Sequence, residues 1–126
     1  MAVLKYSLLF SALFSVHVFA LGEENIGFDN KLSACAQIKN WKFIPDSDIP
    51  LLSFEVELNK SIGECGCKSA FSSFTVSAKK DGYSSFLMGG KINFAKAGKK
   101  YLPLATDEKL ISSGVLEVQL SCAQPD

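Results

Sequence analysis

Residues 73–88 have the sequence SFTVSAKKDGYSSFLM. The apolar residues Phe74 and Val76 alternate with serine and threonine, which is the two-residue period of a strand with one buried face. An Asp-Gly pair at residues 81–82 separates this run from a second one that begins at Tyr83. Asp-Gly between two such runs is a strong short-range signal for a β-hairpin. The stretch therefore predicts a fold built from β-strands.

The same alternation occurs on both sides of the hairpin. Apolar and polar residues alternate over residues 52–59 and again over 116–122, and shorter runs lie at about 33–43, 92–94 and 101–104. This makes six or seven short strands. Their number and spacing predict an all-β fold, an antiparallel β-sandwich that is immunoglobulin-like in general shape. A small closed barrel is the alternative.

Three local signals add detail to the predicted sandwich. Pro103 has no N–H to donate to a ladder, so its strand should lie at the edge of a sheet. Gly89 and Gly90 predict a turn or a bulge. Residues 106–112 could hold one short helical turn.

Residues 1–20 have the features of a secretory signal peptide. Lys5 supplies a positive start, and a short apolar run leads to Ala20, after which we expect cleavage. The run is shorter than the roughly 20 apolar residues that span a bilayer, so we expect no stable membrane insertion after cleavage. Residues 21–30 are then expected to form a flexible N-terminal segment, and residues 31–126 a single disulfide-stabilised β-sandwich domain.

The composition argues against several classes of function. The chain has 13 basic residues, all lysine, and 13 acidic residues, so its formal net charge is zero. A nucleic-acid binder needs an excess of basic charge. The single histidine, His17, lies in the expected signal peptide, and histidine-dependent nucleophilic catalysis and histidine-ligated metal sites need an imidazole. We therefore expect no enzyme, no catalytic residue, no metal and no cofactor.

Two groups of residues have both a structural and a functional interpretation. Glu55 and Glu57 would lie about 7 Å apart on one strand face. Paired carboxylates occur in glycoside hydrolases, but a solvated strand face explains this pair better. Among the aromatic residues, Phe71 is out of phase with its strand and is the one we expect to be most exposed. The others considered are expected mostly in the core: Trp41, Phe43, Tyr83 and Phe86.

The four cysteines are Cys35, Cys65, Cys67 and Cys122. An even number in a small exported domain indicates two disulfides. A bridge between Cys65 and Cys67 would close a strained ring across Gly66. Each is therefore expected to pair outward, one with Cys35 and one with Cys122. At strand spacing they would share one face and tie the first and last strands to the middle of a sheet. The spacing leaves the order of the pairing open.

The Cys65-Gly66-Cys67 element also allows a different function. Two thiolates two residues apart can chelate Cu(I), and Lys68 beside them could activate a redox thiol. Structural disulfides are favoured, because partner cysteines are available and no Met or His accompanies the pair.

Three segments resemble a family of small predicted secreted or periplasmic bacterial proteins of unknown function that contain a Cys-Gly-Cys element. These segments are Gly63–Ser69, Leu102–Ala105 and Leu120–Ala123. The resemblance covers about Ser33 to Ala123 and implies a location in the bacterial envelope. It implies no activity, cofactor or catalytic residue.

The leading functional hypothesis is a periplasmic or secreted, non-enzymatic β-sandwich that binds a protein or another envelope component. A sheet edge or an exposed loop patch would form its recognition surface. The alternative is a thiol-redox or Cu(I)-handling protein that uses Cys65 and Cys67. A histidine-free hydrolase that uses Glu55 and Glu57 is a third hypothesis.

Overall fold

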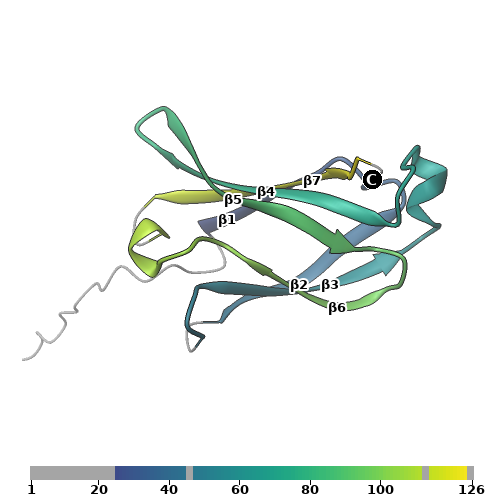
Figure 1. Cartoon of the computed structure of the whole chain (residues 1–126), viewed down its shortest axis with the longest axis horizontal. Helices are drawn as coiled ribbons and strands as arrows, with labels where there is room; N and C mark the ends of the chain where they lie inside the picture. Colours follow the sequence, from purple (N-terminus) through teal and green to yellow (C-terminus); the bar gives the residue numbers. More distant parts are fainter. Residues whose placement is uncertain (1–24, 45–46, 112–113, 125–126) are drawn as a thin grey trace, which may run out of the picture.

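A computed structural model describes residues 25–44, 47–111 and 114–124. Within these residues the chain forms seven strands in two sheets that lie face to face (Figure 1). This confirms the predicted all-β sandwich, and the two sheets remain separate where a closed barrel would have joined them. The expected signal peptide, residues 1–20, lies outside the described residues. No helix in the described part of the chain has the length and hydropathy to cross a membrane.

The larger sheet has four strands and the smaller has three. The order in the larger sheet is β1 (Ile26–Asn30), β7 (Val115–Cys122), β4 (Phe71–Lys80) and β5 (Tyr83–Asn93). The order in the smaller sheet is β2 (Ala36–Ile44), β3 (Leu51–Leu58) and β6 (Gly98–Pro103). Two short 3-10 helices, η3 (Ile62–Cys65) and η4 (Glu108–Ile111), lie in the connections. Only the β2–β3 and β4–β5 hairpins stay within one sheet, and the other connections between described strands cross to the opposite sheet.

Strand β1 corrects part of the expectation of a flexible segment over residues 21–30: residues 26–30 form a strand, while residues 21–24 lie outside the described residues. Residues 26–30 pair in parallel with β7, from Ile26 opposite Leu116 to Asn30 opposite Leu120. The Ile26 side chain is buried, and Phe28 packs against the core. Two inward apolar residues give too short an alternation to recognise in the sequence. The segment forms a strand because it can pair with the free edge of β7.

The core lies between the sheets, where the alternating apolar residues of the strands point inward. These are Leu52, Phe54 and Val56 of β3, Phe74 and Val76 of β4, and Leu116, Val118 and Leu120 of β7. All of them are buried, so the period of two in the sequence predicted the inward face of these strands correctly.

Strand β5 continues through Gly89 and Gly90, where the sequence predicted a turn or a bulge. Gly90 lies within the strand, packed against the Phe74 ring. A Cβ at this position would come within 2.9 Å of Cε1 of Phe74, which explains why the residue is glycine. The bulge falls instead at Leu87, where the register shifts between the pairs Val76–Met88 and Ser77–Phe86. Pro103 lies on β6, an edge strand, as predicted.

Candidate functional site

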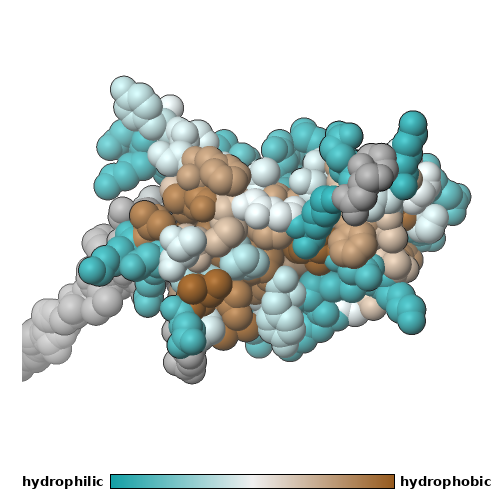
Figure 2. Space-filling model, in the orientation of Figure 1, coloured by the Kyte–Doolittle hydropathy of each residue, from teal (hydrophilic) through white to brown (hydrophobic). Residues whose placement is uncertain are grey.

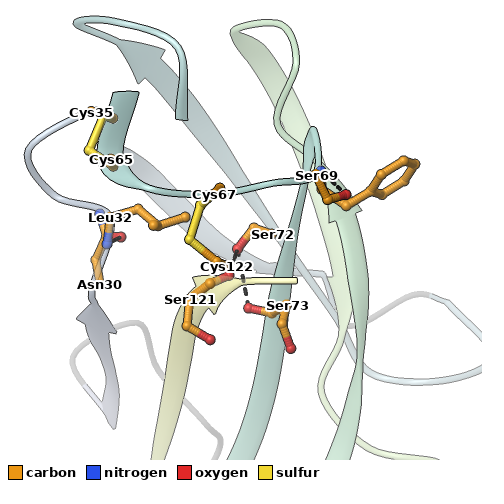
Figure 3. The surroundings of a disulfide bond; sticks show 11 residues. Asn30, Leu32, Cys35, Cys65, Cys67, Ser69, Ser72, Ser73, Ser121 and Cys122 are labelled. Carbon is orange, nitrogen blue, oxygen red and sulfur yellow. Dashed lines mark hydrogen bonds between the residues drawn. A yellow bond between two sulfur atoms is a disulfide. The ribbon is translucent and has the colours of Figure 1, made fainter. Parts of the chain in front are cut away.

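The two disulfides lie together at one end of the sandwich. They join Cys35 to Cys65 and Cys67 to Cys122 (Figure 3). This is one of the two outward pairings that the sequence left open. We call this region the stapled end, defined by the four cysteines and η3.

Cys65 and Cys67 do not lie on a strand, which corrects the geometry expected from their spacing. Cys65 is the last residue of η3, and Gly66 follows it in the left-handed conformation with a φ of 96°. Cys67 then lies in the loop that leads to β4. The turn at Gly66 explains how neighbouring cysteines reach different partners: Cys35 lies just before β2, and Cys122 ends β7.

Hydrogen bonds brace the same end. The Asn30 side chain accepts a bond from the Leu32 amide and donates one to the carbonyl of Ala36, which fixes the turn between β1 and β2. The buried Ser72 hydroxyl lies 3.1 Å from the carbonyl oxygens of both Ser73 and Ser121, so its single proton is shared between these two acceptors (Figure 3). These bonds satisfy polar groups that burial would otherwise make costly.

The stapled end contains no free thiol, since all four cysteines are in disulfides. A Cu(I) chelate or a redox pair would require Cys65 and Cys67 to be available as thiolates together. In the structure each sulfur is bonded to a different partner.

The opposite end carries most of the exposed apolar side chains. Of seven large hydrophobic residues exposed in the described part of the chain, five lie here: Ile49, Tyr83, Phe86, Leu110 and Val115. The strand registers and connections place all five residues at the same end, because the β2–β3 loop, the β4–β5 turn, η4 and the start of β7 all lie there. Apolar surface gathers toward this side of the molecule in Figure 2. We call these five residues the apolar end.

The β4–β5 hairpin extends this end beyond the rest of the sandwich (Figure 1). Its turn residues, Asp81 and Gly82, have φ values of 53° and 84°. Positive values at both positions are typical of the type I′ turn, and Asp-Gly suits that turn. The predicted hairpin is therefore confirmed, and we call residues 79–86 the arm.

The arm corrects the expectation that Tyr83 and Phe86 belong to the core. Tyr83 is 77% exposed and Phe86 is 67% exposed, whereas Phe71, which we expected to be the most exposed, is only 40% exposed. The arm projects past the smaller sheet, so no facing layer covers its side chains. The strand lengths in the structure agree with this: β4 and β5 have 10 and 11 residues around the turn, and the facing strand β3 has 8. Trp41 and Phe43 are partly buried against the core.

The paired glutamates lie on the outer face of the smaller sheet. Both are exposed, as expected for a solvated strand face. The Asn40 side chain donates a hydrogen bond to Glu55 at 3.2 Å, and Lys39 forms an ion pair with Glu57 at 2.8 Å. An open depression of about 560 Å³ lies over this face and includes Trp41 and Lys99 in its lining. Each carboxylate is thus held by its own neighbour, on an open surface.

Comparison with known proteins gives one match. Residues 8–125 match the model of a family described as an uncharacterized protein conserved in bacteria (DUF2195). No curated protein and no solved structure gives a significant match.

Proposed function

The chain belongs to this DUF2195 family of uncharacterized bacterial proteins, and from that premise we propose that it is an exported, non-enzymatic interaction module. It holds a protein or another envelope component at the apolar end. The observation that carries the proposal is the gathering of five exposed hydrophobic residues at the end opposite the disulfides. Exposed apolar side chains gathered at one end of a molecule are typical of interaction sites.

Export to the periplasm or beyond is supported by the disulfides. Such bonds persist in oxidising compartments and are rare in the cytoplasm of most bacteria. The signal-peptide features of residues 1–20 agree with this location. Edman sequencing of the protein recovered from the periplasm or medium should begin at Leu21, and a start at Met1 would contradict cleavage.

A role without catalysis is supported by the surfaces themselves. The only histidine lies in the expected signal peptide. Glu55 and Glu57 are engaged by Asn40 and Lys39 on an open face, and glycosidases place their carboxylates on either side of a bound sugar.

The competing thiol-redox or Cu(I) function makes an opposite prediction. It requires Cys65 and Cys67 as free thiols, whereas the interaction module requires them as structural links. A thiol count on protein from an oxidising compartment separates the two. We expect no free thiols and peptide links from Cys65 to Cys35 and from Cys67 to Cys122; two free thiols would favour the competing function.

The interaction itself is tested by photo-crosslinking in the native bacterium. A photoreactive residue at Leu110 reports on contacts at the apolar end, because this side chain is exposed on η4 at that end. We expect a discrete adduct that disappears with the double substitution Tyr83→Ser and Phe86→Ser. The matched control is Phe71→Ser, which removes an exposed aromatic side chain from the other end.

Three outcomes of the crosslinking experiment would contradict the proposal. Adducts that persist in the Tyr83→Ser, Phe86→Ser variant, or that are lost equally with Phe71→Ser, would contradict the assignment of the apolar end. Complete absence of an adduct at Leu110 would contradict it as well.

A further inference from the structure

The two sheets have four edges, and three of them carry features that prevent pairing with another chain. Strand β1 has only five residues. Strand β2 is bulged between Lys39 and Lys42. Strand β6 carries Lys99 and Lys100 and ends in Pro103. Short edges, bulges, lysine and proline are the usual means of protecting the unpaired backbone of an edge strand.

The first half of β5 lacks these features. Strand β5 has 11 residues, and none of those from Tyr83 to Gly90 is charged or proline. In the described part of the chain, β4 pairs with one side of β5 and no strand pairs with the other. The bulge at Leu87 limits the regular part of this free edge to the segment Tyr83–Phe86.

We propose that two copies of this chain pair antiparallel through the free edges of their β5 strands, over residues 83–86. An antiparallel edge is complementary to itself, because every second residue presents both its N–H and its C=O to the free side, and a two-fold axis places these groups opposite the C=O and N–H of a residue in the second copy. The inference rests on the proposed function, since it names a second copy as one protein held at the apolar end.

Charge distinguishes this edge from the others for pairing between identical chains. Two β2 edges or two β6 edges would bring lysine close to lysine, and like charges directly opposite in a sheet are destabilising. The β5 segment brings together only Tyr83, Phe86 and the two serines between them. No charge has to be desolvated when this pair forms.

The shape of the molecule permits the pairing. The arm projects beyond the sandwich, so two arms can approach while the two bodies stay apart (Figure 1). The contact would also cover Tyr83 and Phe86, the two most exposed large hydrophobic residues described. A segment this short buries less surface than the roughly 1,200 Å² of a stable interface, so we expect a weak dimer that depends on concentration.

Sedimentation equilibrium of the cleaved, oxidised protein tests the proposal from micromolar to millimolar concentration. The wild type should move from the monomer mass toward twice that mass. Ser85→Lys and Ser85→Glu should each stay monomeric. Ser85 lies on the free edge, so the like charges introduced in the two copies would lie close together and repel. An equimolar mixture of the two variants should recover the dimer, which excludes misfolding as the cause. Ser61→Lys, at the stapled end, is the matched control and should behave as the wild type.

Several results of the sedimentation experiment would overturn the dimer. One is a wild type that stays monomeric at millimolar concentration. Another is a dimer that Ser85→Lys leaves intact, and a third is a dimer that Ser61→Lys weakens as much as Ser85→Lys does. A monomer that still gives the Leu110 adduct with a different protein would overturn this inference and leave the proposed function standing. Loss of that adduct together with an intact dimer would overturn the proposed function and leave the dimer standing.

Discussion

The stapled end and the apolar end are held in order by different means. At the stapled end two covalent links join Cys35 to Cys65 and Cys67 to Cys122, and the exposed apolar surface is small. At the apolar end no disulfide lies among the described residues, local hydrogen bonds such as that from the Lys109 amide to the Asp107 side chain help to hold the loops, and five large hydrophobic residues face solvent. This sandwich therefore has its covalent links at one end of the strands and its proposed contact surface at the other.

The largest effect should come from cutting the covalent links. The disulfides span 30 and 55 residues, and the chain-entropy model assigns loops of this size about 4 kcal/mol each. We expect Cys67→Ser with Cys122→Ser, or Cys35→Ser with Cys65→Ser, to lower the free energy of unfolding by this order. Urea unfolding measures it. A loss under about 1 kcal/mol for both pairs would remove the distinction between the ends.

A smaller effect should come from the packing that holds η4. Ile111 is almost completely buried, whereas its neighbour Leu110 is half exposed. Ile111→Ala should lower the free energy of unfolding by about 2–4 kcal/mol through the cavity it leaves. Leu110→Ala should change it by less than about 0.5 kcal/mol. Equal losses in urea unfolding would mean that the apolar end is not organised as a buried anchor under an exposed surface.

Two glycines with positive φ, one at each end, allow the backbones of the two ends to be compared. Gly114 has a φ of 88°, and a Cβ there would lie 3.0 Å from the carbonyl oxygen of Lys79. Gly66 has a φ of 96° with nothing near the same position. Gly66→Ala should cost about 1 kcal/mol from the left-handed conformation alone. Gly114→Ala should cost more, because the contact adds to the strain; the reverse order in thermal unfolding would contradict this geometry.

The smallest effect concerns acid stability on the outer face of the larger sheet. The Gln119 side chain donates a hydrogen bond to Asp29 at 3.0 Å and lowers the pKa of that carboxyl, and nearby Lys31 adds to the lowering. A lowered pKa in the folded state contributes stability above the ordinary value of about 4, and this is lost as pH falls through the folded pKa.

Replacing Gln119 tests this effect. The pKa of Asp29 in Gln119→Leu, followed by NMR titration, should rise toward its ordinary value. Glu117→Gln, which removes the neighbouring partner of Lys79, is the control and should move it much less. An unchanged value in Gln119→Leu would show that the hydrogen bond is not the cause.

Local alternation was enough to predict the inward faces of β3, β4 and β7, because burial on one side of a strand leaves a period of two in the sequence. The Asp-Gly turn was equally local and was predicted correctly. Strand β1 was missed because five residues carry little pattern, and their partner lies almost at the other end of the sequence.

The candidate site was harder to predict because its features depend on parts of the chain that are distant in the sequence. Whether Tyr83 and Phe86 are core or surface depends on how far the opposite sheet extends, which no local pattern contains. The order of the disulfides depended on the turn at Gly66, since spacing alone allows both outward pairings.

The parallel pairing of β1 with β7 also has a consequence for folding order. The two strands are among the most distant in sequence, as the contact between Asp29 and Gln119 across 90 residues illustrates. Contacts of such high contact order form slowly. The larger sheet cannot be completed until residues 115–120 have emerged from the ribosome, so the growing chain stays incompletely folded while it is made. A sheet that closes late is compatible with the proposed export, because a chain that crosses a membrane channel has to remain unfolded until it has passed.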